Sequence, residues 1–307
     1  MNNFDDLFEQ QPQKEAALQK PEGQKERPKR QWWQIREEKQ RKEAYASLDK
    51  IFGAFAEGNG NMEAYLDVQS RFPFHSARNA LLIGAQCPQA QRVGGYKEWT
   101  AQGIEILEEE KRLPIIILEP GKAYRRDDGS IGQNFYAKEV YDISQTSAQG
   151  QHQPQVAYDD RLLLKGLIAS SPVQIRAVDE LPQGRGAVFS EEQNAILVKK
   201  GMDAPDIFRC VSLEIANVQL ARSNEGYSRE ADSYKAYAVS YMLCKRYGIE
   251  AKGYDIGRLN SVFKGQDPRE DVPAALSDMR ETFKSLNGRM ARAMGLTRDT
   301  KQKEPER

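Results

Sequence analysis

Apolar side chains in the first third of the chain recur every three or four positions, which is the period of an α-helix with one buried face. Two segments show this period, residues 62–72 and 77–85, and a charged helical stretch over residues 35–55 precedes them. Pro73 separates the two segments, because proline lacks the backbone N–H that a helix interior needs. The folded part of the chain is therefore predicted to begin with helices.

The pattern changes after Cys87-Pro88, where strands are expected. Residues 113–118 form an unbroken apolar run, which is typical of a buried strand. Residues 135–143 follow the turn at Asp127-Asp128-Gly129 and alternate imperfectly between apolar and polar, which fits a second strand. A short helix is expected just before them, over residues 97–102. This part of the chain is predicted to be an α+β domain.

The second half of the chain is predicted to be mostly helical with a small β-sheet. Strands are expected at residues 173–178, 187–190 and 195–198, and helices at residues 159–169, 203–222, 230–247 and 274–294. Asp203 and Pro205 suit the start of one helix, and Gly248 suits the end of another. The fold class is therefore predicted to be α+β.

Composition predicts two domains between polar ends. The first 40 residues are rich in Gln, Glu, Lys and Pro and poor in aliphatic side chains, so they cannot offset the entropy of folding. The Gln-rich stretch around His152 is a linker by composition. The predicted boundaries are a disordered polar and basic tail at 1–40, a first domain at 41–146, a linker at 147–158, a second domain at 159–295 and a disordered tail at 296–307.

Residue counts exclude several classes of function. The chain has 45 Lys and Arg against 45 Asp and Glu, so net charge gives no support for nucleic-acid binding, although it allows local basic patches. Cys87, Cys210 and Cys244 are too scattered for a disulfide framework or a thiolate metal cluster, and we expect them to pack. The only histidines are His75 and His152, too few for a site built from several imidazoles. Without an apolar run of membrane-spanning length or a signal peptide, a cytoplasmic location is expected.

Three separated blocks of the sequence resemble the ArdC/LtrC antirestriction family. The blocks are residues 65–99, residues 113–120 (LPIIILEP) and residues 140–146 (VYDISQT). The resemblance implies an ArdC-N-like α+β domain that binds single-stranded DNA, followed by a zincin-like peptidase domain. Within this family, the chain most resembles the proteins found on conjugative and integrative elements of Gram-positive bacteria. The implied partners are single-stranded DNA and conjugation or DNA-processing proteins, with no membrane.

Cationic and aromatic residues of the first block are candidates for contacting DNA, since cations neutralise phosphates and rings stack on bases. The candidates are Arg71, Arg78, Asn79, Arg92, Lys97 and Trp99. Arg78 and Asn79 can equally form a solvated helix face or a buried hydrogen-bond anchor, and Trp99 can belong to the core. The acidic run Glu108–Glu110 would repel a phosphate backbone.

The zinc motif that the resemblance implies is degenerate in this chain. A zincin helix carries His-Glu-x-x-His, whereas the aligned segment is Leu213-Glu214-Ile215-Ala216-Asn217. The third ligand should come from the next helix, where Lys235 and Tyr237 stand. Only the general base, Glu214, remains, and we expect it to pair with Lys235. The interpretation is an inactive pseudo-peptidase that holds no metal and needs no cofactor.

Two alternatives remain open. One is an active metal-dependent peptidase, which would require different ligands from those aligned here. The other is a protein-interaction scaffold without DNA affinity. The neutral net charge and the acidic run favour this alternative, because neither attracts a phosphate backbone.

Overall fold

The computed structural model describes residues 31–150 and 158–296. Most of the predicted tails, together with His152 in the predicted linker, lie outside these residues. The elements combine helices with two small sheets, which confirms the predicted α+β class. None of the helices in the described part is long and apolar enough to cross a membrane.

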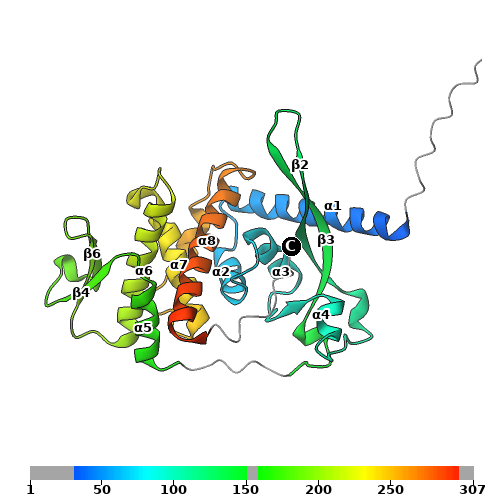
Figure 1. The fold of residues 1–307 in the computed structure, drawn as a ribbon. Coiled ribbons are helices and arrows are strands. Elements are labelled where there is room, and N and C mark those ends of the chain that lie inside the picture. The colour runs from blue at the N-terminus through cyan, green and yellow to red at the C-terminus, as the bar shows by residue number, and fades with distance from the viewer. Residues whose placement is uncertain (1–30, 151–157, 297–307) are drawn as a thin grey trace, which may run out of the picture. The chain divides into compact units, whose positions relative to one another are not determined.

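The first group of elements combines four helices with a three-stranded sheet (Figure 1). The helices are α1 (Trp32–Ala56), α2 (Met62–Arg71), α3 (Ala77–Gln86) and α4 (Tyr96–Thr100). The strands are β1 (Val93–Gly94), β2 (Ile115–Arg125) and β3 (Ile131–Asp142), in the order β1-β3-β2 with both pairs antiparallel.

Helix α1 begins earlier than composition suggested, so residues 32–40 are helical and the predicted tail is too long. The helix carries ion pairs one turn apart: Glu37–Arg41, Glu38–Lys42 and Lys39–Glu43. Such pairs stabilise a helix without needing aliphatic side chains. Side chains of α1 also reach β3, where Glu37 accepts a hydrogen bond from the Ala137 N–H at 2.9 Å and Gln40 donates to Glu139 at 2.6 Å.

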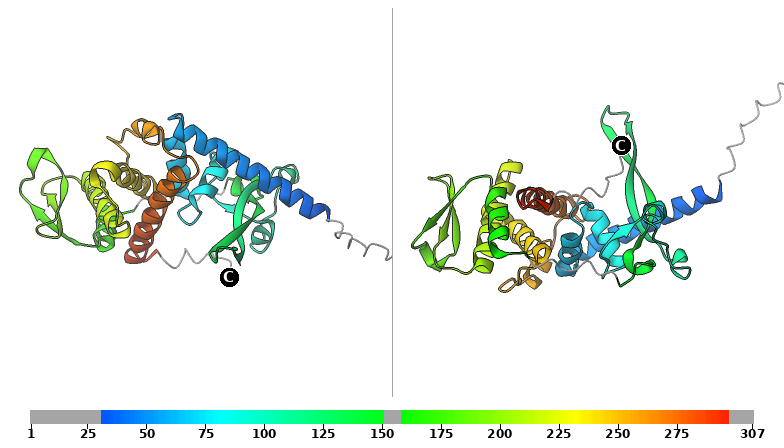
Figure 2. Two further views of the ribbon diagram at one scale, coloured as in Figure 1. Left: turned by 90° about the horizontal axis from the view of Figure 1, so that it is seen from above. Right: turned by 60° about the horizontal axis from the view of Figure 1, so that its bottom comes forward.

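The second group consists of four helices and a second small sheet. The helices are α5 (Asp160–Ser170), α6 (Ala204–Ser223), α7 (Arg229–Tyr247) and α8 (Asp271–Ala293), and they lie side by side in all three views (Figures 1 and 2). The strands are β4 (Gln174–Val178), β5 (Ala187–Ser190) and β6 (Ala195–Lys199). Strand β6 is central, parallel to β4 and antiparallel to β5.

One buried cluster joins residues from both predicted domains. Helix α2 packs against α7, and α3 contacts α8. Asp67 of α2 accepts a hydrogen bond from the Tyr241 hydroxyl of α7 at 2.8 Å and forms an ion pair with Lys245 at 3.1 Å. The guanidinium of Arg280 on α8 donates to the carbonyls of Phe74 and His75. The two-domain division stays a prediction, but these helices share one core.

Helix α3 covers the free edge of β2 with two amide side chains placed two turns apart. Asn79 accepts from the Leu118 N–H and donates to the Leu118 carbonyl, both at 2.9 Å. Gln86 makes the same pair of bonds with Ile116, also at 2.9 Å. An uncovered edge would leave these backbone groups unpaired or open to another strand. The helix thus completes the hydrogen bonding of the sheet.

Candidate functional site

The residues predicted to contact DNA do not share one environment. Arg78 on α3 and Lys97 on α4 are exposed, as a phosphate-binding cation must be. Arg71 is half-buried, and its guanidinium donates to the Pro88 carbonyl, so it holds the turn after α3. Within the predicted set, Arg78 and Lys97 are therefore the two residues whose cationic groups are exposed to a ligand.

Asn79 is a buried anchor, so its assignment to the DNA surface is corrected. Its side chain is 7% exposed, and the two bonds to Leu118 use both ends of the amide. A group that is already paired on both sides has no donor or acceptor turned toward a nucleic acid. Of the alternatives named for Asn79, the structure shows the buried hydrogen-bond anchor.

Trp99 belongs to the core, so its assignment to base stacking is also corrected. The ring is 1% exposed, packs in a small cluster with Ile106 and Tyr141, and donates its indole N–H to the Tyr141 carbonyl at 3.0 Å. Arg92 stacks on this ring at 4.8 Å and donates to Gln102. Neither ring face of Trp99 can receive a base.

The acidic run is partly neutralised by its neighbours. Glu108 forms an ion pair with Lys111, and Glu110 accepts a hydrogen bond from Gln145 at 2.9 Å. The Lys111 partner holds the pKa of the Glu108 carboxyl below its usual range. The repulsion of a phosphate backbone is accordingly weaker than three free glutamates would exert.

The outer half of β2 and β3 is an exposed two-stranded ribbon that the sequence reasoning missed (Figure 1). Lys122 and Tyr124 alternate along β2, with Arg126 two positions further on, and all three are exposed. Tyr136 of β3 is on the same face as Gly132, by the strand's period of two. The alternation at 122–126 was a visible signal, but it falls outside the apolar runs that predicted the strands.

Tyr124 lies flat across the ribbon because its cross-strand partner is a glycine. A Cβ atom on Gly132 would come within 2.5 Å of the Tyr124 ring. The ring is 44% exposed and that of Tyr136 is 41% exposed. The Tyr136 hydroxyl donates to Glu119 at 2.7 Å, and Lys138 binds the other oxygen of the same carboxylate at 2.7 Å. One face of the ribbon thus carries two exposed rings, and the exposed cations Lys122, at a bulge of β2, and Arg126, just beyond the strand, lie close to Tyr124 along the chain.

The predicted zinc motif lies on α6, and its two terminal positions hold no metal ligand. Leu213 has no donor atom. The Asn217 amide donates to the Leu213 carbonyl at 3.0 Å and accepts from the Tyr227 hydroxyl at 2.6 Å. On α7, the Tyr237 hydroxyl accepts a hydrogen bond from the Asp255 N–H at 2.7 Å. These side chains do not fit a zinc ion, which takes imidazole, thiolate or carboxylate ligands.

Glu214 pairs with Arg229 rather than with Lys235, which corrects the expected ion pair. Its carboxylate is buried, receives the Arg229 guanidinium on one oxygen and accepts from the Phe189 N–H of β5 at 3.0 Å on the other. Lys235 instead bridges Asp232 at 3.0 Å and Asp278 at 2.9 Å. The register of the helix pair explains the difference, because Arg229 is at the first position of α7 and Lys235 is almost two turns further along.

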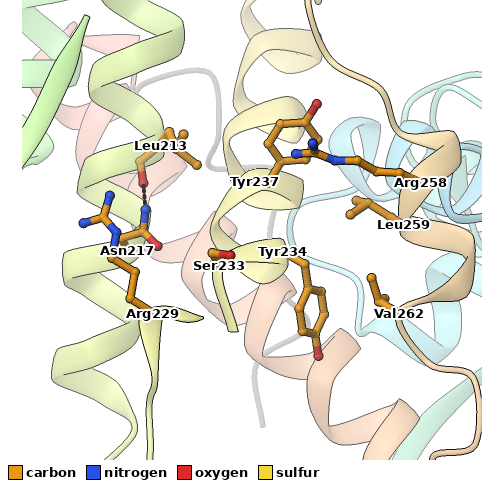
Figure 3. A pocket seen from close by; sticks show the side chains of 9 residues that line it. All are labelled: Leu213, Asn217, Arg229, Ser233, Tyr234, Tyr237, Arg258, Leu259 and Val262. Carbon is orange, nitrogen blue, oxygen red and sulfur yellow. Dashed lines mark hydrogen bonds between the residues drawn. The ribbon is translucent and has the colours of Figure 1, made fainter. Parts of the chain in front are cut away.

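A pocket of about 490 Å³ opens beside this segment (Figure 3). Its lining residues come from α6, α7 and the 3-10 turn that begins at Gly257: Leu213, Asn217, Arg229, Ser233, Tyr234, Tyr237, Arg258, Leu259 and Val262. In the described part of the chain, no three His, Cys, Asp or Glu side chains gather as a set that could hold a metal ion. Lys235 is not among the lining residues.

The cysteines lie where thiolate chemistry is disfavoured. Cys244 is buried on α7, and burial raises the pKa of its thiol to about 12. Burial likewise raises the pKa of Cys210 on α6. A thiol with a raised pKa is a poor nucleophile at neutral pH, so both residues serve as packing.

Comparison with known proteins assigns no family to the chain. No protein-family model matches the chain, and no curated protein matches it. Among solved structures, the chain is similar to the crystal structure, metal-free, of the antirestriction protein ArdC from plasmid R388. The two share 14% sequence identity with a TM-score of 0.49 over 81% of this chain and 98% of the other. No activity or ligand follows from a match at this level.

Proposed function

We propose that the chain binds single-stranded DNA through the exposed face of the β2–β3 ribbon, as part of a mobile genetic element and in an antirestriction or conjugation role. The observation that carries the proposal is that two exposed rings, Tyr124 and Tyr136, share one face of the ribbon and that the exposed cations Lys122 and Arg126 flank Tyr124 along the chain. The location in the cytoplasm and the partners among conjugation and DNA-processing proteins belong to the same proposal.

The ribbon suits an unpaired strand better than a duplex. Stacking on an aromatic ring requires a base face that is free, and each stacked base contributes about 1–3 kcal/mol whatever its identity. Lys122 and Arg126 would neutralise phosphates between the stacked bases, which makes binding depend on salt. Arg78 on α3 and Lys97 on α4 add exposed charge in the first group of elements. Binding without strong sequence preference follows from such contacts.

The test is fluorescence anisotropy with the full chain, an unstructured oligothymidine and a duplex, each at two salt concentrations. Tyr124→Ala should weaken binding to the single strand by about 5- to 150-fold, the equivalent of one stacked base. Tyr45→Ala is the matched control, because Tyr45 is an exposed tyrosine on α1 outside the ribbon. Equal losses in the two variants, or none in either, would refute the ribbon as the binding surface.

Charge removal separates the ribbon from the surface predicted by sequence. Lys122→Gln with Arg126→Gln should reduce both affinity and its salt dependence. Arg78→Gln with Lys97→Gln is the competing pair from the earlier prediction. If the wild-type chain binds no oligonucleotide even at low salt, the chain is instead a protein-interaction scaffold.

We further propose that the pocket beside α6 has no peptidase activity. Support comes from Glu214, whose two oxygens are occupied by Arg229 and the Phe189 N–H, so the carboxylate is not poised to take a proton from water. A cation beside this carboxylate also disfavours a dication. Purified protein should contain no stoichiometric zinc, and a chelator should not lower its melting temperature. One zinc per chain, or peptide hydrolysis that Glu214→Gln abolishes, would restore the metal-dependent peptidase.

A further inference from the structure

The pocket between α6, α7 and the 3-10 turn that begins at Gly257 has a charge that a peptidase cleft does not explain. Its nine lining residues include two arginines and no carboxylate. Glu214 pairs with Arg229, so the exposed Arg258 carries the remaining positive charge among the lining residues. Figure 3 shows Arg229 beside Asn217 on one wall and Arg258 beside Tyr237 on the opposite wall.

Both guanidinium groups are held in place before any ligand arrives. Arg229 is fixed by Glu214, which is itself fixed by the Phe189 N–H. Arg258 lies over the ring of Tyr237 at 4.3 Å. The Tyr237 hydroxyl accepts from the Asp255 N–H, so its own proton remains available to donate. A planar guanidinium held in this way presents its remaining N–H groups as a fork that matches the oxygens of a phosphate or carboxylate.

The rest of the lining suits an apolar or flat body attached to that anion. Leu213, Leu259 and Val262 supply aliphatic surface, and the rings of Tyr234 and Tyr237 supply aromatic surface. The volume of about 490 Å³ lies within the usual range for small-ligand sites. An inorganic anion alone would leave this apolar surface uncovered.

We propose that this pocket binds a small organic anion, a phosphate or carboxylate carried on a ring-bearing body, with Arg258 and Arg229 as the anion-binding residues. Ser233 lines the pocket between the two arginines and adds a hydroxyl donor. The site is separate from the β2–β3 ribbon, so its test does not depend on DNA binding.

The experiment is calorimetric titration of the full chain with four probes. Thymidine monophosphate and N-acetylphenylalanine carry the anion, while thymidine and N-acetylphenylalanine amide are their neutral counterparts. At least one anionic probe should bind about tenfold or more tightly than its neutral counterpart, which is the difference expected from one charge-assisted hydrogen bond. Which of the two anions binds decides between phosphate and carboxylate.

Variants assign the binding to the pocket. Arg258→Gln should weaken the anionic probe by about tenfold or more, whereas Arg176→Gln, an exposed arginine on β4 away from the pocket, should leave it unchanged. Since Arg229→Gln alone would strand the buried Glu214, the second variant combines Glu214→Gln with Arg229→Gln. Tyr124→Ala should leave the affinity unchanged, which excludes binding on the ribbon. Equal affinity for charged and neutral probes, no binding of either anion at millimolar concentration, or no effect of Arg258→Gln would overturn the proposal.

Discussion

Asn79 and Gln86 make the same hydrogen bonds to the edge of β2 but differ in burial, which allows the cost of an uncovered edge to be measured. Asn79 and its partner Leu118 are 7% and 5% exposed, whereas the Gln86 side chain is exposed. After Asn79→Ala, the Leu118 N–H and carbonyl lose their partners in a place that water reaches poorly. After Gln86→Ala, water can replace both bonds to Ile116.

The expected destabilisation follows from these two environments. Each buried backbone group left unpaired costs about 1–3 kcal/mol, so Asn79→Ala, which strands two of them, should lower the free energy of unfolding by roughly 2–6 kcal/mol. Gln86→Ala should cost less than about 1 kcal/mol, because exposed hydrogen bonds exchange with water at little net loss. Asn79→Asp should resemble the alanine variant, since a carboxylate cannot donate to the Leu118 carbonyl.

Urea unfolding followed by circular dichroism measures these differences as shifts in the midpoint at constant slope. DNA binding of folded Asn79→Ala should equal that of wild type, because the side chain does not reach the surface. Equal destabilisation by the two alanine variants would refute the role of burial. A folded Asn79→Ala that loses DNA affinity would return this residue to the binding surface.

Two further predictions concern the first group of elements. Burial, helped by the nearby Arg280 guanidinium, lowers the pKa of His75 below its ordinary value of 6.5, so the unfolded chain takes up its proton first. The free energy of unfolding should therefore fall as the pH drops below about 6.5. His75→Gln should reduce this fall when urea midpoints are compared at pH 7.5 and 5.5. Equal falls in wild type and variant would contradict the role of His75. Trp99→Ala should cost about 3–5 kcal/mol by emptying the cluster with Tyr141, and a calorimetric melting temperature close to that of wild type would show that the ring is dispensable.

The helices and strands could be predicted from the sequence because each has a local signal. The period of apolar positions places α2, α3 and the long helices of the second half, and Gly248 ends α7 in a left-handed conformation with φ of 72°. The outer halves of β2 and β3 are exceptions, since neither face is buried and the apolar pattern that predicted the inner halves is absent there. Composition assigned residues 32–40 to the tail for a related reason, because charged pairs and contacts with β3 replace aliphatic packing there.

The site residues were harder to predict because their roles depend on partners distant in the sequence. Asn79 looks like a polar helix position until its contact with Leu118 is known, and nothing local marks Trp99 as buried. Glu214 was recognised from the motif, but its partner Arg229 begins a different helix. Arg258 could not be found at all, since only the packing of its turn against Tyr237 brings it to the pocket.

Helix α7 lines the pocket with its first half and binds α2 with its second half. Tyr237 lines the pocket, while Tyr241 and Lys245, one and two turns along, bind Asp67 of α2. The second half of α7 is therefore constrained by its contacts with α2, whereas these contacts do not constrain the pocket residues of the first half. Deleting the helix would expose the core under α2. The helix would therefore be retained for the stability of the fold whether or not the pocket binds a ligand.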